Sequence, residues 1–457
     1  MEISSIIDKS QKRRYYWFIV IVIALGGFLA GYDTSIIGPA LIYVVPFFHI
    51  SGGLSGILVS IESLFMVFGA LTSGPIIDKI GRRPLLIVDA IIYIIFALTS
   101  ALAINISMLI LSRALVGIAV GADYAIAPAF LSELSHTNSR GRSNMTEQLM
   151  YFSGAIIAFW VGYFLSFTAN WRLMFGVAVI PAIILIVVRI YLPESPRWLL
   201  SKGKIESAKE SLVLLGANTG DLSGLDNEIH KRSPSILSIL TDKAYKKALI
   251  IMGFFMFFVP ATGINVILSY GPTIYKYLGL SGPGAILNTG ISETLGIAEF
   301  LLSFLLIDRV GRRPLGVLAY IGEAASLLIS IIGIIFFNRD IVALSVILIF
   351  VSMNLFLLFF HIGPGSILWT LSGEIFPTEI RGKMVGFLMA IDVFTNFVIL
   401  LIFPIWQAAF GLFSFYELEF IIAAIAAVFM LLFLRETKNV PLEEVKERYS
   451  GSWIVKR

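Results

Sequence analysis

Twelve apolar runs, each long enough to cross a membrane as a helix, constrain this chain more than any other feature of its sequence. The hydrocarbon core of a bilayer is about 30 Å thick, and a helix needs roughly 20 apolar residues to cross it. Hydrophobic residues make up 58% of the 457 residues and charged residues 14%, against about 25% charged in soluble domains. The sequence therefore predicts an all-α integral membrane protein with twelve transmembrane helices. The runs span residues 16–44, 54–77, 85–104, 108–131, 148–167, 173–192, 249–270, 285–307, 315–337, 341–371, 384–404 and 415–434.

The same composition excludes several classes of protein. A soluble enzyme is excluded because no water-soluble core could bury so much apolar surface, and a nucleic-acid-binding protein because the net charge is only +4. The chain has no cysteine and no phosphate-binding P-loop motif, and its histidines lack the H-x-x-x-H spacing of a zinc site. We expect no enzymatic activity, no cofactor and no metal. The four histidines are His49, His136, His230 and His361.

Lysine and arginine are distributed very unevenly over the loops. An even number of spans places both termini on one side of the membrane, and that side collects 29 of the 34 lysines and arginines. The opposite side has three, and Arg113 and Arg189 fall inside spans. Because cytoplasmic loops are enriched in positive charge, both termini are predicted to be cytoplasmic. The first apolar run is too long for the core of a signal peptide and is interpreted as a retained helix.

The chain contains an internal repeat of three charged motifs in the same order. The motif D-x-x-G-R-R-P occurs at 78–84 and again at 308–314. Glu133, followed by R-G at 140–141, recurs as Glu374, followed by R-G at 381–382, and P-E-S-P-R at 193–197 has a weaker echo in R-E-T-K at 435–438. This duplication predicts two homologous six-helix bundles. They comprise residues 1–192 and 248–434, with a cytoplasmic linker at 193–247 that contains a helix at 205–215, and a cytoplasmic tail at 435–457.

The repeated charges indicate a conformational lock at the cytoplasmic face. The two arginines of each D-x-x-G-R-R-P motif can pair with the glutamates of the second motif and with carbonyl groups at helix ends. We predict that such pairs hold the cytoplasmic face closed and break when it opens. The alternative is that the charges only enforce the orientation of the chain in the membrane. The predicted gate residues are Asp78, Arg82, Arg83, Glu133, Arg140, Glu194, Asp308, Arg312, Arg313, Glu374, Arg381 and Glu436.

These motifs resemble those of a known family. The segment G-P-I-I-D-K-I-G-R-R at 74–83 is similar to the signature loop of the major facilitator superfamily. The segments P-E-S-P-R-W-L at 193–199, G-I-N at 263–265 and E-I-F-P at 374–377 resemble its sugar porter family. The resemblance covers nearly the whole chain, from G-Y-D at 31–33 to E-T-K at 436–438. It implies a multi-pass transporter of the plasma membrane, functional as a monomer, in which two bundles rock around a central site by alternating access.

Two charged residues lie at membrane depth where they can meet. A charge there costs several kcal/mol unless it is paired or hydrated. Asp33 lies in the outer half of the first span, and Arg113 lies roughly 8 Å from the outer end of the fourth. The resemblance to sugar porters implies that Asp33 takes up the transported proton and that Arg113 tunes its affinity. A permanent structural ion pair, as in uniporters, is the alternative.

Two further aspartates depart from the sugar porter pattern. Asp123 stands in a segment that resembles the fourth span of proton-coupled phosphate and organic-metabolite porters, and we predict that it takes part in proton coupling. It lies ten residues beyond Arg113, so the two side chains can face one cavity. Asp392 stands where sugar porters commonly have glutamine. Five other acidic residues lie in or near spans and are assigned no role: Glu62, Asp89, Glu293, Glu299 and Glu323.

A neutral polyol is expected to bind amide and hydroxyl groups beside an aromatic ring, because amides both donate and accept hydrogen bonds. The resemblance to sugar porters implies such a set, but Ala155 replaces its second span-five glutamine, and Val259-Pro260 replaces a glutamine pair before Gly263. Half of the family's amide set is therefore missing. For each residue, packing between helices is the alternative. The predicted substrate-binding residues are Gln148, Asn265, Trp369, Asp392 and Asn396.

Glycine and proline interrupt two of the predicted spans. The seventh is expected to break at Pro260, Gly263 and Gly271-Pro272, and the tenth at the G-P-G sequence of residues 363–365. Broken helices line cavities and act as hinges in transporters. Ordinary proline kinking is the alternative.

The sequence favours a proton-driven symporter that imports a sugar or similar polyol, with that solute, protons and the lipid bilayer as its partners. A second hypothesis keeps the fold but moves phosphate, an organic acid or another charged metabolite, as Asp123 suggests. Against it, Arg113 is the only strongly basic residue well inside a span. A non-transporting sensor is the third hypothesis. Sensors of this fold tend to carry long signalling tails, whereas only short segments flank the first and last spans.

Overall fold

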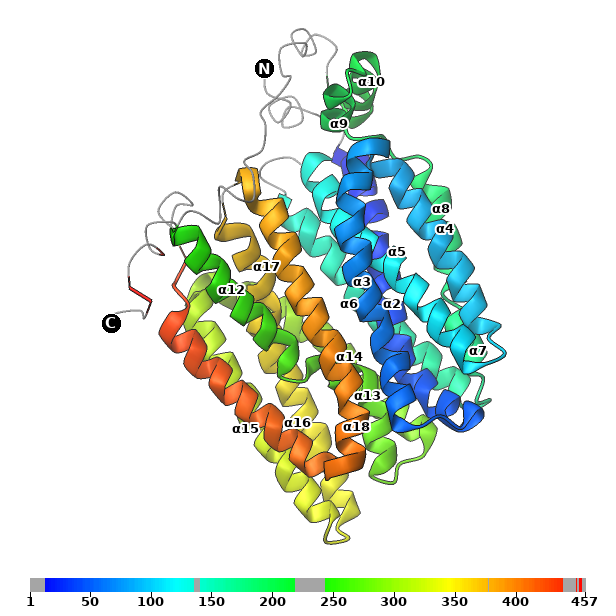
Figure 1. Ribbon diagram of the computed structural model, residues 1–457, viewed down its shortest axis with the longest axis vertical. Coiled ribbons are helices and arrows are strands. Elements are labelled where there is room, and N and C mark those ends of the chain that lie inside the picture. The colour runs from blue at the N-terminus through cyan, green and yellow to red at the C-terminus, as the bar shows by residue number, and fades with distance from the viewer. Residues whose placement is uncertain are drawn as a thin grey trace. The chain divides into compact units, whose positions relative to one another are not determined.

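The computed structural model describes residues 13–134, 140–217, 243–376, 378–438, 449 and 452–453, and nearly all of them are helical (Figure 1). A helix satisfies its backbone hydrogen bonds internally, as a segment that crosses a bilayer must. The helices of the first half are α2 (Arg13–Phe48), α3 (Gly52–Ile80), α4 (Arg82–Ala101), α5 (Ile106–Leu134), α6 (Arg140–Ser166), α7 (Trp171–Gly176), α8 (Val179–Arg189), α9 (Pro196–Ser201) and α10 (Ile205–Leu215). Those of the second half are α12 (Lys243–Ala261), α13 (Ile264–Tyr277), α14 (Gly282–Val310), α15 (Arg312–Phe337), α16 (Val342–Ile362), α17 (Pro364–Glu374) and α18 (Thr378–Phe433).

Eleven helical segments of the described chain are long and apolar enough to cross a membrane. The longest, Met384–Phe433 within α18, has 50 residues, which is enough for two crossings. Gly411 divides it with a φ of +81°, so the eleventh and twelfth predicted spans form one element with a break. The twelve predicted spans are therefore confirmed.

The helices form two compact units, which we describe separately. The first comprises residues 1–34, 64–158 and 172–232, and the second comprises residues 35–63, 159–171 and 233–457. Helices α2, α3, α6 and α7 thus contribute residues to both units. The division into bundles at 1–192 and 248–434 stays a prediction.

Small residues bring α2 and α6 into backbone contact within the first unit. A Cβ atom on Gly31 would lie 1.9 Å from the carbonyl oxygen of Tyr151, and one on Gly154 would lie 2.0 Å from that of Phe28. Only glycine fits at either place. Helices in membranes associate through such small residues because lipid supplies no hydrophobic force between them.

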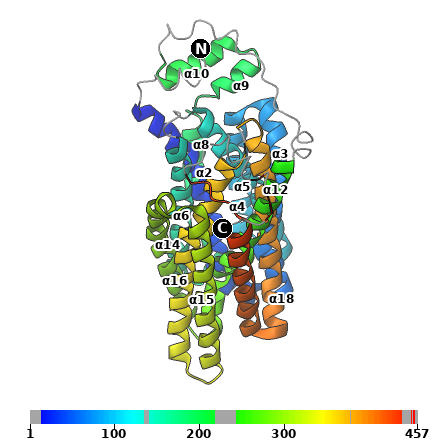
Figure 2. The same cartoon turned by 90° about the vertical axis from the view of Figure 1, so that its left-hand side faces the viewer.

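The linker helices pack on the core of the first unit. Helices α9 and α10 contact each other (Figure 2), and their Trp198 and Leu212 join a buried cluster with Leu86 and Phe130. The predicted helix at 205–215 is confirmed as α10, and Gly216 ends it in the left-handed conformation at φ +102°. Residues 218–242 of the predicted linker lie outside the described residues.

The second unit is organised around α15, which packs against α16 and α18. Its core contains fully buried Met252, Phe255, Leu371 and Met430. Large apolar side chains also cover the outside of both units, for example Ile180 and Ile347, which are 62% and 58% exposed. Such an exterior is stable where hydrocarbon rather than water surrounds it.

Candidate functional site

A buried ion pair links α2 to α5 in the first unit. Nη1 of Arg113 lies 2.7 Å from Oδ2 of Asp33, and the same nitrogen donates to the Asp33 carbonyl oxygen at 3.2 Å. The Arg113 side chain is 0% exposed and that of Asp33 5%. The guanidinium also lies 5.6 Å from the ring centroid of Phe175, which is favourable for a desolvated cation. The contact that the sequence predicted between Asp33 and Arg113 is present.

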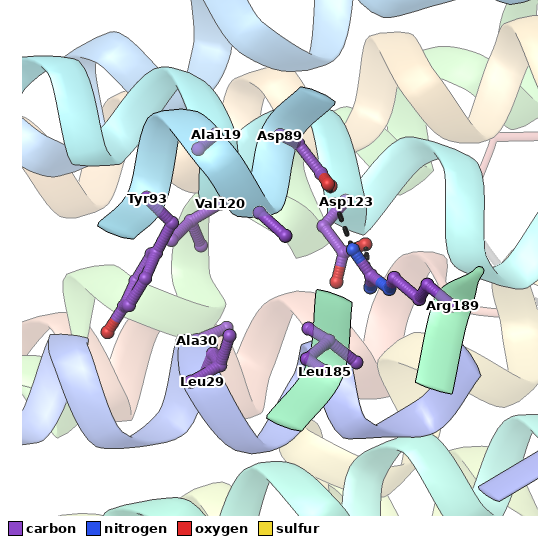
Figure 3. A pocket seen from close by; sticks show the side chains of 11 residues that line it. Leu29, Ala30, Asp89, Tyr93, Ala119, Val120, Asp123, Leu185 and Arg189 are labelled. Carbon is purple, nitrogen blue, oxygen red and sulfur yellow. Dashed lines mark hydrogen bonds and ion pairs between the residues drawn. The ribbon is translucent and has the colours of Figure 1, made fainter. Parts of the chain in front are cut away.

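Asp123 bonds to Arg189, an arginine for which the sequence predicted no partner. It lies 2.7 Å from Nη2 of Arg189, while Asp89 lies 2.9 Å from Nη1 of the same guanidinium (Figure 3). Ten residues separate Asp123 from Arg113, about 15 Å along a helix. Arg113 and Asp123 are therefore too far apart to share one ion pair. Arg113 pairs with a residue of α2, and Asp123 belongs to a cluster with residues of α4 and α8.

The Arg189 cluster borders a small cavity. Its volume is about 20 Å³, and Gly26, Ala30, Tyr93, Asp89, Asp123 and Arg189 are among the residues that line it (Figure 3). A cavity of this volume is large enough for one water molecule. The charged groups of the Arg189 cluster thus border a small cavity whose other walls are mainly apolar.

In the first unit, several of the predicted gate residues form charge-assisted contacts around the start of α4. Nη2 of Arg82 lies 2.8 Å from Oε1 of Glu133. Glu194 accepts hydrogen bonds from the backbone N–H groups of Arg82 at 3.0 Å and Arg83 at 3.2 Å. The first residues of a helix have free N–H groups and a partial positive charge, so a carboxylate is favourable there. Burial raises the pKa of the Glu194 carboxyl, and these N–H groups and the Arg82 charge oppose that rise.

The second unit repeats this arrangement atom for atom. Nη2 of Arg312 lies 2.7 Å from Oε1 of Glu374. Glu436 accepts from the backbone N–H groups of Arg312 at 3.0 Å and Arg313 at 3.1 Å. The weak sequence echo between 193–197 and 435–438 therefore marks a real structural repeat.

The remaining predicted gate residues are placed less uniformly. The Asp308 side chain is 77% exposed and lies 3.2 Å from Nη1 of Arg312. Asp78 is also exposed, and its backbone oxygen accepts from Nε1 of Trp198 at 3.2 Å. The side chains of Arg140 and Arg381 lie outside the described ones.

The predicted substrate-binding residues belong to both units. Gln148, half-buried on α6, is in the first unit. The second unit holds the other four: Asn265 on α13, Trp369 on α17, and Asp392 and Asn396 on α18. Nδ2 of Asn396 donates to Oγ of Ser63 at 3.1 Å. That these side chains contact one solute stays a prediction.

The predicted helix breaks occur at two of the three expected places. Helix α12 ends at Ala261, and Gly263 at φ +95° precedes α13. Helix α16 ends at Ile362, and Pro364 begins α17. The expectation for Gly271-Pro272 was wrong, because α13 runs through both residues. In a membrane helix, side chains and neighbouring helices can bond the carbonyl group that a proline leaves without an N–H partner.

The Gly263 break has a specific steric requirement that gives a testable prediction. A Cβ atom there would lie 1.9 Å from Oε1 of Glu419, and a positive φ costs a side-chain-bearing residue about 1–2 kcal/mol. Gly263→Ala is expected to lower the thermal stability of the purified protein. Gly253→Ala is the matched control, since its Cβ would meet only Ile391 at 3.4 Å. Equal behaviour of the two variants would contradict this requirement.

Two groups of functional candidates were missed by sequence reasoning. Arg189 was counted inside a span but given no partner, and Asp89 was given no role. In the second unit, Nδ1 of His361 lies 2.9 Å from Oε2 of Glu299, at the end of α16. Charged residues inside predicted spans are the signal that could have found these groups, because each must be paired or hydrated. Glu62, Glu293 and Glu323 are buried.

Twelve apolar spans with duplicated charge motifs and buried ion pairs between helices define a polytopic membrane transporter built from two related halves. The family model described as "Sugar (and other) transporter" matches residues 19–449. The chain belongs to this sugar transporter family.

Individual relatives and a solved structure agree with this assignment. The chain is 33% identical over 436 residues to the glucose transporter GlcP of Staphylococcus epidermidis, covering 94% of this chain and 96% of the relative. It is 32% identical over 437 residues to a D-xylose transporter of Levilactobacillus brevis, covering 94% of each. A crystal structure of a D-xylose-proton symporter matches with a TM-score of 0.77 and 25% identity, over 93% of this chain and 99% of that one. These matches confirm the predicted major facilitator fold.

Proposed function

We propose that the protein is a secondary active transporter that moves a sugar or related polyol by alternating access, driven by proton symport. The relatives named above are a glucose transporter, a D-xylose transporter and a D-xylose-proton symporter. The single observation that carries the proton coupling is the buried pair between Asp33 and Arg113.

The mechanism follows from the burial of that pair. While Asp33 is ionised, the pair is neutral as a whole. Protonation of Asp33 removes the carboxylate charge opposite the Arg113 guanidinium, which is 0% exposed, and breaking a buried ion pair costs several kcal/mol. Another anionic group or water can offset this loss. A conformation that supplies one becomes favoured, so proton uptake changes the preferred state of the transporter.

The charge motifs supply the gate in this proposal. The contacts of Arg82 with Glu133 and of Arg312 with Glu374 join helices at the cytoplasmic face, and they hold that face in its closed state. We place both termini in the cytoplasm, the chain in the plasma membrane as a monomer, and the boundaries of the two bundles at 1–192 and 248–434.

Loss of one gate contact is expected to shift the balance between states. Glu133→Gln and Glu374→Gln each remove about 1 kcal/mol of charge-assisted bonding, about a fivefold change in the ratio of closed to open protein. Because the chain has no cysteine, a single Gln148→Cys reporter can be labelled without background. A membrane-impermeant maleimide applied from the cytoplasmic side should react faster in each variant.

The control for this labelling experiment is Glu210→Gln, which changes an exposed glutamate of α10. It should leave the labelling rate unchanged. If the gate variants label no faster than this control, the charges serve orientation in the membrane and not gating.

The experiment that tests the function as a whole is uptake into proteoliposomes. A panel of labelled pentoses, hexoses, inositols, phosphate and carboxylic acids is offered with and without an inward proton gradient. We expect accumulation of one or more sugars or polyols only when the gradient is present. Accumulation of phosphate or an acid, with no sugar transported, would overturn the proposal.

The hypothesis of an anionic solute has little support in the first unit. Both intramembrane arginines already bond carboxylates: Arg113 bonds Asp33, and Arg189 bonds Asp89 and Asp123. An incoming phosphate or carboxylate would have to displace one of these partners.

A further inference from the structure

The Arg189 cluster contains more negative than positive charge. Asp89, Asp123 and Arg189 are 4%, 7% and 1% exposed, and Glu147 on α6, at 7%, interacts electrostatically with Asp123 and Arg189. Three ionised carboxylates and one guanidinium would give a net charge of −2. Each uncompensated buried ion costs several kcal/mol. The cluster is therefore most stable when it holds protons.

The geometry indicates where a proton is held. Asp89 and Asp123 bond the two terminal nitrogens of one guanidinium, which are joined through a single carbon atom, so their carboxyl groups are held close together. Two carboxylates that share a site do not both ionise readily, and a proton held by one of them allows a hydrogen bond between the two.

The surrounding helices fix the guanidinium in place. Nη1 of Arg189 also donates to the carbonyl oxygen of Leu86 at 2.5 Å. On the other side, α2 approaches so closely that a Cβ atom on Gly26 would lie 1.6 Å from Oδ2 of Asp123 and 2.6 Å from Nη2 of Arg189. These contacts hold the cation in place, so the proton is the mobile part of the cluster.

We propose that Asp89 and Asp123 form a proton-binding dyad on Arg189, a second protonation site distinct from the pair of Asp33 and Arg113. Uptake of one proton converts two carboxylates into a carboxylate and a carboxylic acid joined by a hydrogen bond, and release reverses this. Among the described residues, the titratable Tyr93 from α4 lines the same cavity, and Glu147 from α6 interacts electrostatically with Asp123 and Arg189. Around the cavity, α2 contributes Gly26, Leu29 and Ala30, and α8 contributes Leu185 and Arg189.

The dyad is connected to a predicted substrate-binding residue through α6. Release of the proton adds a negative charge beside Glu147, which is followed in sequence by Gln148. The backbone oxygen of Glu147 lies only 2.7 Å from the Cβ position of Gly27 on α2. Repulsion on Glu147 therefore acts on the α2–α6 contact. The use of the dyad in transport rests on the proposed proton symport, whereas its protonation does not.

The test is infrared difference spectroscopy of the purified protein as a function of pH. We expect a carboxylic-acid C=O band that disappears as pH rises, shifts in D₂O and is present in the wild type but absent from each dyad variant. Asp89→Asn and Asp123→Asn each leave one aspartate paired with the Arg189 guanidinium, so both variants should fold and lose this band. Asp33→Asn and Glu147→Gln should retain it.

Three results would overturn the dyad. One is a wild-type protein without such a band anywhere between about pH 4 and pH 9; this needs no variant. The second is a set of carboxylic-acid bands that is the same in the wild type and in both dyad variants. The third is a band lost only in Glu147→Gln, which would place the proton on Glu147. Since no solute is transported in this experiment, a failure of proton symport would leave these results unaffected, and uptake measurements would reveal it separately.

Discussion

Asp33→Asn is expected to abolish uphill uptake of the transported sugar while counterflow exchange continues. Asparagine keeps the size of aspartate and can still accept a hydrogen bond from Arg113, but it cannot take up a proton. A pH difference of about one unit supplies about 1.4 kcal/mol per proton, enough for about tenfold accumulation. The variant should lose all of this accumulation. Labelled sugar in proteoliposomes, with an acidic exterior for uptake and an equal pH for exchange, measures both quantities.

The matched control for this variant is Asp340→Asn. Asp340 is exposed and has a φ of +60°, a conformation that asparagine also adopts readily. The Asp340→Asn variant should accumulate sugar as the wild type does. Uphill accumulation by Asp33→Asn would show that the proton binds elsewhere. Equal loss of uptake and exchange would mean that the ion pair is structural, as in a uniporter.

Much of the fold and part of the site could be predicted because the physical constraints are local or repeated. A run of twenty apolar residues has few stable conformations besides a membrane helix. The contacts of Arg82 with Glu133 and of Arg312 with Glu374 followed from a motif that occurs twice. Asp33 and Arg113 could be matched by depth, because each is a charge in the outer half of its own span.

The other contacts depend on how each helix is rotated about its axis and shifted along its neighbours. The depth of a residue in the membrane determines neither of these. Arg189 lies 66 residues from Asp123 and 100 from Asp89, and their contact requires α4, α5 and α8 to present particular faces to one another. An uncertainty of one residue rotates a helical side chain by about 100°. The continuous path of α13 through Pro272 likewise depends on its neighbours, since an isolated helix would kink or break there.

Arg189→Met is expected to destabilise the protein more than loss of any exposed arginine. Removing the guanidinium leaves Asp89 and Asp123 together without a cation, at 4% and 7% exposure. Breaking a buried ion pair by removing one partner typically costs about 3–5 kcal/mol. The purified variant should therefore melt at a clearly lower temperature in detergent. It should also gain stability as pH falls, because protonation of both aspartates removes the repulsion that remains.

Two variants separate this electrostatic effect from loss of packing. Arg339→Met changes an exposed arginine and should leave the melting temperature near that of the wild type. The triple variant Arg189→Met, Asp89→Asn, Asp123→Asn has no ionised group on the three positions, and neutral groups of similar volume can replace a buried ion pair with little loss of stability. It should recover most of the stability that Arg189→Met loses. A triple variant as unstable as Arg189→Met would show that the long arginine side chain stabilises the bundle by packing, and that the charge of the cluster matters little.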